Sequence, residues 1–210
     1  MKKILHGIEA LFAAIKKITC GRMLAGRHIQ LAAGEDPSDR LAYDGWLKVY
    51  KRKIKNREYD VLKDYNAVSA IIVNEFNELL LVKQYRPALM RETLEIPAGV
   101  MDNKGESEHE SLVRELKEET GLQITPESLV HALDYKPMVG FSNSLMKVFY
   151  GKASKVELKA GLINDEDVYE ALWMGLDEVS GKISRGEIQD VKTILAYYYL
   201  TGAGKEGHKV

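Results

Sequence analysis

Three glutamates gather within five residues of the chain, at Glu115, Glu118 and Glu119, directly after Arg114. On a helix, residues four apart are neighbours, so Glu115 and Glu119 share a face and Glu118 lies at its edge. Carboxylates this close repel one another, and a hard divalent cation such as Mg²⁺, which prefers oxygen ligands, would offset the repulsion. Arg114 can orient a carboxylate through charge-assisted hydrogen bonds. The spacing therefore predicts a metal-binding helix face; the alternative is a solvated acidic helix.

Signals for the start and the end of this helix flank the glutamates. Ser107 and Glu110 have the spacing of a capping box, in which each side chain accepts a hydrogen bond from the other's backbone N–H. Gly121 is placed to end the helix in a left-handed turn. Three apolar side chains can face a core between these limits: Leu112, Val113 and Leu116.

The rest of the chain reads as short β-type runs followed by two helices, which predicts one mixed α/β domain. We expect the strand at 93–96 to be stopped by Pro97, Ala98 and Gly99. Hairpin turns are expected near 55–56 and at 74–78. The predicted strands are residues 46–54, 57–62, 67–73, 79–84, 93–96, 129–135, 145–150 and 168–174, and the predicted later helices are 176–183 and 190–200.

Composition and charge narrow the class of protein. The 210-residue chain has a net charge of −1, so it offers no basic field for binding nucleic acid. Its one cysteine, Cys20, cannot form a disulfide within the chain, which suits a reducing compartment and favours a cytoplasmic location. No apolar stretch approaches the roughly 20 residues that a membrane-spanning helix needs. The histidines show no zinc-ligand spacing, and no phosphate-binding glycine loop ends in Lys-Ser or Lys-Thr.

Residues 1–45 are expected to form an accessory segment ahead of a single domain at residues 46–210. Glycines and polar residues between positions 21 and 45 predict a connector with little regular structure. A signal peptide or membrane association is the alternative for the N-terminus, but His6 and Glu9 interrupt its apolar run. Apolar residues at helical spacing instead predict an amphipathic helix that packs on the domain or on a partner subunit: Ile4, Ile8, Leu11, Phe12 and Ile15.

A wider pattern surrounds the glutamates. Gly99 precedes Glu106, which stands eight residues before Arg114, and the string closes with Gly121-Leu122. This resembles the Nudix box, Gly-x5-Glu-x7-Arg-Glu-U-x-Glu-Glu-x-Gly-U, in which U is a bulky aliphatic residue. The match is complete from Glu106 to Leu122. Six residues rather than five separate Gly99 from Glu106, and we place the extra one in the loop ahead of the helix, where it leaves the helix register intact.

The resemblance extends over about residues 46 to 200. The run Val82-Lys-Gln-Tyr-Arg-Pro-Ala88, the run Leu94-Glu-Ile-Pro-Ala-Gly99 and a proline fifteen residues past the box, Pro137, are similar to the ADP-ribose pyrophosphatase branch of the Nudix family. This implies a Nudix-type α/β/α sandwich around a mixed β-sheet, here with an N-terminal helical and β-hairpin extension.

The resemblance also implies a metal site. Glu115, Glu119 and the backbone carbonyl of Ala98 would bind Mg²⁺, for which Mn²⁺ could substitute, with Glu118 in support. Arg114 would act beside them. Two or more ions would bridge a diphosphate and activate a water.

Substrate recognition follows from the same resemblance. Arg86 would hold phosphate, since its planar fork suits that group, and Glu95 and Phe141 would also contact the substrate. Trp46 and Tyr59 would stack on the base, in a clamp shared between the subunits of a homodimer. The alternatives are a solvated surface arginine at Arg86 and ordinary strand packing for the two aromatic residues.

The general base is the point at which the pattern departs from the family. Many bacterial members carry a glutamate where this chain has Ser144, which cannot serve as a carboxylate base. The acidic stretch 164–167 is the predicted substitute, with Glu166 first, Asp167 second and Glu118 as a helix-borne alternative. A loop of solvated acids without a catalytic role is the competing interpretation.

The function implied is Mg²⁺-dependent hydrolysis of a nucleoside diphosphate sugar, with ADP-ribose as the best single substrate and AMP and ribose 5-phosphate as products. A UDP- or GDP-sugar diphosphatase is the nearest rival. A catalytically silent sensor of nucleotide sugars on the same fold is the rival from another class, although the complete set of box carboxylates argues against it.

Overall fold

The computed structural model describes residues 36–103, 105–158, 163 and 165–202, and all of them belong to one compact unit, Ala32–Val210. The amphipathic helix expected near the N-terminus lies outside the described residues. The predicted boundary between residues 45 and 46 stays a prediction.

A mixed sheet of seven strands forms the centre of the fold. Its main path runs β10-β5-β4-β9-β8, with β6 paired to β5 and β7 paired to β4. The β4–β9 pair is parallel and the other pairs are antiparallel, so the sheet is mixed as predicted. The strands are β4 (Ala67–Val73), β5 (Glu78–Arg86), β6 (Arg91–Glu95), β7 (Ala98–Val100), β8 (Val130–Tyr135), β9 (Met146–Lys152) and β10 (Val168–Gly175).

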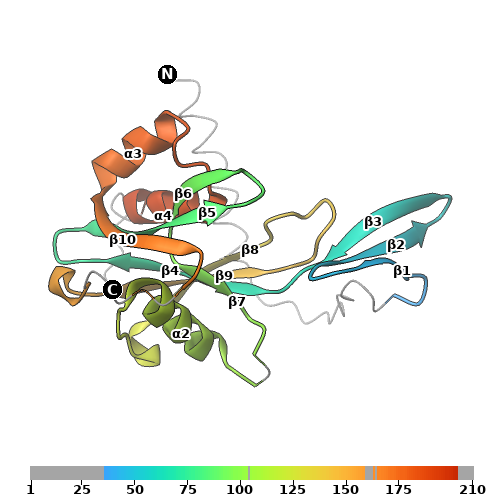
Figure 1. Ribbon diagram of the computed structural model, residues 1–210, viewed down its shortest axis with the longest axis horizontal. Helices are drawn as coiled ribbons and strands as arrows, with labels where there is room; N and C mark the ends of the chain where they lie inside the picture. The colour runs from blue at the N-terminus through green and yellow to red at the C-terminus, as the bar shows by residue number, and fades with distance from the viewer. Residues whose placement is uncertain (1–35, 104, 159–162, 164, 203–210) are drawn as a thin grey trace. The chain divides into compact units, whose positions relative to one another are not determined.

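Helices cover both faces of this sheet (Figure 1). Helix α2 (Glu108–Thr120) packs on one face through Leu112 and Leu116, in a core shared with β4, β5 and β9. Helices α3 (Leu176–Ser184) and α4 (Val191–Gly202) pack on the other through a second core. The predicted α/β/α sandwich is therefore confirmed. In the described part of the chain, no helix is long and apolar enough to cross a membrane.

Local sequence signals set both ends of α2. Ser107 and Glu110 form the predicted capping box, with Glu110 N–H donating to Ser107 Oγ at 3.3 Å and Ser107 N–H donating to Glu110 Oε2 at 2.8 Å. Gly121 ends the helix at φ 72°, a left-handed conformation that glycine adopts without steric cost. The register of the helix is therefore fixed by its own residues.

A second sheet of three antiparallel strands precedes the sandwich: β1 (Arg40–Asp44), β2 (Lys48–Ile54) and β3 (Arg57–Lys63). The predicted β2–β3 hairpin and its turn at Lys55 and Asn56 are confirmed. Strand β1 was not expected, and the prediction of little regular structure is wrong for residues 40–44, which pair with β2. The sheet is joined to the sandwich where Leu62 N–H donates to the carbonyl of Phe141 at 2.7 Å.

The strand predicted to stop at Pro97 resumes after it. Ala98, Gly99 and Val100 form β7, which changes partner and pairs with β4 rather than β5. Pro97 has no N–H to donate, so the ladder is interrupted there, while its carbonyl accepts from Ala70 N–H at 3.0 Å. Two 3₁₀ turns complete the described elements, η1 (Pro126–Ser128) and η2 (Lys155–Glu157).

Candidate active site

The carboxylates of α2 lie directly against the backbone of β7. Ala98 N–H donates to Glu119 Oε2 at 3.1 Å. At Gly99, a Cβ atom would stand 1.9 Å from Cδ of Glu115, so only glycine lets this carboxylate pass. The interruption of the strand at Pro97 thus provides a free N–H at Ala98 and open space at Gly99, and both face the acids of α2.

Arg114 donates hydrogen bonds to three acids of the box. Its Nη1 donates to Glu115 at 2.8 Å and to Glu118 at 3.1 Å. Its Nε and Nη2 donate to the two oxygens of Glu106 at 3.2 and 3.3 Å. Hydrogen bonds to Glu106 raise the pKa of Arg114, and the same bonds lower the pKa of Glu106. Glu106 reaches Arg114 despite the extra loop residue, because that residue precedes the helix.

Burial and mutual repulsion raise the pKa values of the two inner carboxylates. Burial is the main cause of the rise to about 8 for the pKa of Glu119, and the charges of Glu115 and Asp165 add to it. Burial also raises the pKa of Glu115, against the lowering effect of Arg114. The ionised forms of these neighbouring acids are therefore disfavoured, a situation that a divalent cation would relieve.

The donors fit Mg²⁺ in kind, since carboxylates and backbone carbonyls are the hard oxygen ligands it prefers. Within the described residues, no three Asp, Glu, His or Cys side chains yet converge on a common point. Glu115 and Glu118 are both held by Arg114, so they would turn away from it to bind an ion. The structure thus presents a donor set beside β7 that metal binding would draw together.

A second cluster lies at the end of β5. Arg86 donates through Nε and Nη2 to the two oxygens of Glu95, at 2.8 and 2.5 Å. Burial alone would raise the pKa of Glu95, but the hydrogen bonds and charges of Arg86 and Lys192 hold it at about 2. The oxygens of Glu95, predicted to contact substrate, are engaged by Arg86, Lys192 and Thr93. Lys192 was not predicted; nothing in its local sequence marks it.

The acidic loop before β10 lies near the box through Asp165. Burial is the main cause of the raised pKa of both Glu115 and Glu119, and the charge of Asp165 adds to it, whereas no such effect is seen from Glu166. Asp165 Oδ1 also accepts from the N–H groups of Asp167 and Val168, at 2.8 and 3.0 Å. Glu166 and Asp167 are exposed. Side-chain length favours Glu166 in the sequence, but length alone does not show which acid influences the box carboxylates.

Ser144, which stands where many relatives have a glutamate, is buried. Its N–H donates to Ser142 Oγ at 3.1 Å, and Ser142 Oγ donates to its hydroxyl at the same distance. The residue stabilises the loop between β8 and β9 and offers no carboxylate.

Comparison with known proteins agrees with this geometry. The model of the NUDIX domain matches residues 64–197, which is more than half of the chain. The chain belongs to the Nudix family.

Relatives of this Nudix hydrolase carry several names. The chain is 34% identical over 67% of its length to a methanol dehydrogenase activator of Bacillus methanolicus, covering 75% of that protein. It is 29% identical over 70% of its length to an ADP-ribose pyrophosphatase of Bacillus subtilis, covering 77% of it. It is 24% identical over 61% of its length to a uridine diphosphate glucose pyrophosphatase of Bos taurus, covering 73%. The predicted resemblance to the ADP-ribose pyrophosphatase branch is confirmed.

The predicted aromatic clamp lies outside the matched Nudix domain and does not form within one chain. Trp46 is 70% exposed and its ring centroid lies 5.8 Å from that of Tyr65. Tyr59 pairs with Arg52 near one end of β2, whereas Trp46 lies in the bend before the other end of that strand, so the two aromatic residues are far apart. Phe141 is exposed in the loop beside β3.

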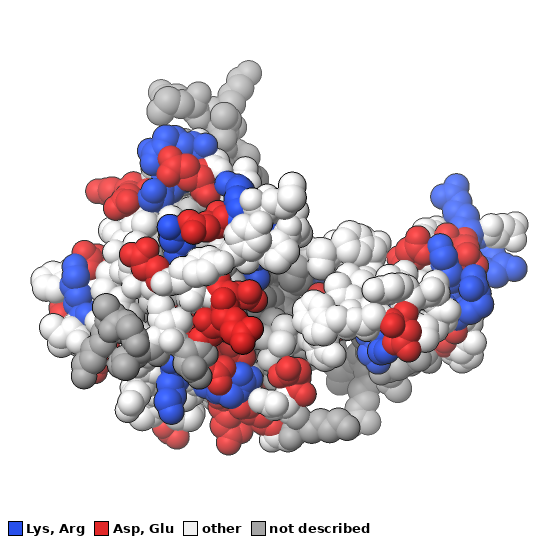
Figure 2. All heavy atoms as spheres, in the orientation of Figure 1, with Lys and Arg blue, Asp and Glu red and all other residues white. Residues whose placement is uncertain are grey.

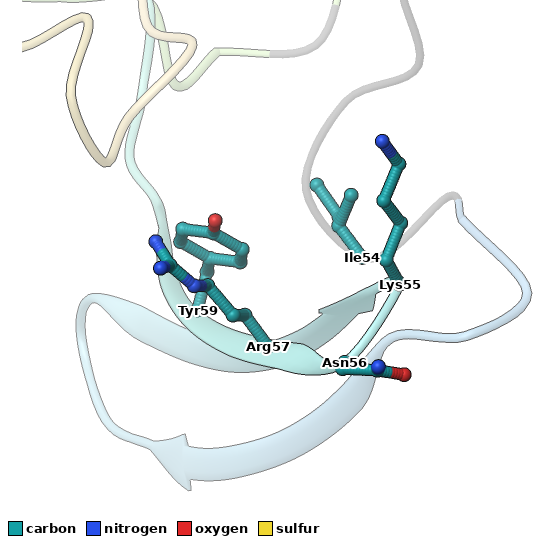
Figure 3. Close-up of a pocket in the computed structure, with 5 residues that line it drawn as sticks. All are labelled: Ile54, Lys55, Asn56, Arg57 and Tyr59. Carbon is teal, nitrogen blue, oxygen red and sulfur yellow. The ribbon is translucent and has the colours of Figure 1, made fainter.

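Tyr59 instead lines a hollow of about 450 Å³ at the turn of the β2–β3 hairpin. Figure 3 shows Tyr59 and Arg57 on one side of the curved hairpin with Ile54 and Lys55, while Asn56 points outward. This hollow is separate from the box carboxylates, which lie beside β7. Basic side chains gather around it, and acidic ones gather on the Nudix sandwich (Figure 2). Residues 40–63 hold eight Lys and Arg against three Asp and Glu.

We expect Gly99→Ala to fold but to lose metal-dependent activity. The added Cβ would collide with the flexible end of Glu115, which must swing away and leave the ligand set. A loss of about 100-fold in kcat/KM is expected, comparable to removal of one electrostatic catalytic group. Mg²⁺ titration calorimetry should show weaker binding.

Gly175→Ala is the matched control, since a Cβ there meets nothing within 4 Å. Equal Mg²⁺ affinity and turnover in the two alanine variants would show that the close approach at Gly99 has no bearing on the metal site.

Proposed function

We propose that the protein hydrolyses the diphosphate bond of a nucleoside diphosphate sugar in a Mg²⁺-dependent reaction, with ADP-ribose as its best substrate. The observation that carries this proposal is the segment Glu95–Gly99. Its first residue holds Arg86, a cation suited to phosphate. At its other end, Ala98 N–H donates to Glu119 and Gly99 leaves room for Glu115. Glu95, which holds Arg86, and Ala98, whose N–H binds Glu119, are thus three residues apart on one stretch of backbone.

The roles follow from this arrangement. Glu115, Glu119 and the Ala98 carbonyl would hold the metal, with Glu118 in support and Arg114 releasing or orienting the acids. When bound, Mg²⁺ neutralises phosphate charge and lowers the pKa of a water molecule. Arg86 would bind a phosphate oxygen through the part of its guanidinium that Glu95 leaves free, since its side chain is 43% exposed.

The acidic stretch 164–167 would supply the general base. Glu166 and Asp167 were the sequence-based choices, and Asp165 joins them because its charge acts on Glu115 and Glu119. We favour Asp165, since a general base must lie within reach of the water that it activates.

A homodimer would complete the substrate site. No residue of β1, β2 or β3 is fully buried, and the sheet exposes Leu41, Tyr43, Ile54 and Tyr59. Three strands with so little covered surface are marginally stable alone, which favours a second copy packing on them. Trp46 or Tyr59 could then reach the partner's site. A cytoplasmic location remains part of the proposal.

Two alternative functions predict different results from the proposed one. Hydrolysis of UDP- or GDP-sugars would use the same metal and phosphate groups, and a relative named uridine diphosphate glucose pyrophosphatase gives this rival some support. A silent sensor would bind a nucleotide sugar without turnover. The intact set of box acids around Arg114 argues against it.

The substrate proposal predicts that ADP-ribose has the highest kcat/KM in a panel with UDP-glucose, GDP-mannose and ADP-glucose. Products would be measured with Mg²⁺, with Mn²⁺ and with chelator, by phosphate release after alkaline phosphatase treatment. Glu119→Gln is the control for contaminating activity and should lose at least about 100-fold. Faster turnover of UDP-glucose or GDP-mannose would show that the protein is a UDP- or GDP-sugar diphosphatase. If no compound were hydrolysed, the catalytically silent sensor would be the hypothesis that remains.

Amide substitutions at the acidic loop test the general base. Asp165→Asn should cut kcat by about 10²–10⁴-fold at neutral pH. Glu166→Gln and Asp167→Asn should change it less than about threefold, because general-base effects require a group within reach of the water. Since Asn can still accept the N–H bonds that Asp165 receives, the loop should keep its shape. A large loss in Glu166→Gln alone would restore the sequence-based choice.

The homodimer predicts a solution mass of two chains by light scattering. If the partner's Trp46 stacks on the base, Trp46→Ala should raise KM about tenfold with little change in kcat, because stacking contributes about 1–3 kcal/mol to both ground and transition states. Trp46→Phe should retain most of the affinity. A monomeric mass at micromolar concentration would contradict the shared site.

A further inference from the structure

Lys192 is a buried cation in an unfavourable place. Its side chain is only 6% exposed, and it is the second residue of α4. Burial of an ammonium group is costly unless it is paired, and the N-terminus of a helix repels positive charge. Two carboxylates offset these costs: Glu95 accepts a hydrogen bond from its Nζ, and Asp190 accepts another at 3.0 Å. The burial of Lys192 therefore depends on its pairing with Glu95 and Asp190.

The carboxylate that Lys192 holds is the one that orients Arg86. Glu95 Oε2 accepts from both Lys192 and Arg86 Nη2, while Oε1 accepts from Arg86 Nε and from Thr93 Oγ1 at 2.6 Å. Glu95 comes from β6 and Arg86 from the paired β5. Lys192 alone comes from α4, so it fixes the pair from outside the hairpin.

Helix α4 is itself docked on the same segment. Asp190 Oδ2 accepts from the N–H and the hydroxyl of Thr193, at 2.9 and 2.6 Å, and so caps the helix. Thr193 Oγ1 in turn accepts from Ile96 N–H at 2.9 Å. These bonds place Lys192 beside Glu95 in a single arrangement.

Charge balance gives Lys192 a second effect. Arg86 and Lys192 offset Glu95 and Asp190, so the cluster is neutral by formal charge. Without Lys192, one excess negative charge would lie beside the group that meets the diphosphate.

We propose that Lys192 is a positioning residue for substrate phosphate: it clamps Glu95 so that Arg86 is presented in one orientation. The clamp rests on the proposed function only in taking Arg86 as the phosphate contact. The orientation of Arg86 itself can be measured without any substrate.

Lys192→Met, which keeps the length and removes the charge, is the first test. Loss of one charge-assisted contact predicts a rise in KM of about 10- to 100-fold with kcat changed less than about threefold. In nitrogen–proton NMR spectra of the wild-type protein, the Arg86 Nε–H signal, assigned with Arg86→Lys, should exchange slowly with water. In Lys192→Met it should exchange rapidly or disappear. Lys192→Arg should recover part of both properties.

Lys155→Met is the matched control. Lys155 pairs with Glu78 at 2.7 Å, at the opposite end of β5 from Arg86, so its removal should change neither KM nor the Arg86 signal. If Lys192→Met does not fold, Glu95→Gln combined with Lys192→Met leaves no new unpaired acid at Glu95 and should show the same rise in KM.

A folded Lys192 variant with the wild-type KM and a slowly exchanging Arg86 signal would overturn the proposal. If the wild-type protein hydrolysed none of the sugars, the proposed function would fail, but the NMR comparison would still decide whether Lys192 orients Arg86.

Discussion

The close approach between β7 and α2 is the constraint on which the rest of the site depends. A carboxylate with a raised pKa, Glu119, is tied to the backbone by one N–H at Ala98, and a second passes where Gly99 has no side chain. Bringing acids into a buried position is costly, and the packing of Leu112 and Leu116 in the core offsets this cost by anchoring the helix. Any change in the distance between strand and helix would move Glu115 and Glu119 together relative to Ala98 and Gly99.

Local signals were enough to predict most of the sandwich. The apolar, β-branched run of β4 and the capping box of α2 both specify their elements without help from distant residues. The strand β1 was missed because its five residues are all exposed and show no apolar alternation. Strand β7 was missed because Pro97 reads as a terminator, and only pairing with the distant β4 shows that the chain resumes.

Some residues of the candidate site could also be predicted from the sequence, and others could not. The box acids follow from spacing on one helix, so Arg114 with Glu115 and Glu118 could be predicted from the sequence. The partners that come from elsewhere could not. Lys192 reaches Glu95 across 97 residues, and the influence of Asp165 on Glu119 depends on how β10 pairs with β5. Contacts within one helix can be predicted from residue spacing, whereas contacts between elements that are far apart in the sequence depend on tertiary packing and cannot.

The extra residue between Gly99 and Glu106 shows which part of the box is free to vary. It lies ahead of Ser107, and Glu106 still meets Arg114. Within α2 the same insertion would turn every later side chain by about 100° around the helix axis, carrying Glu119 away from Ala98. The box therefore has two parts that tolerate insertions differently. The loop before α2 can change in length, whereas the helix cannot, because each acid depends on its position around the helix axis.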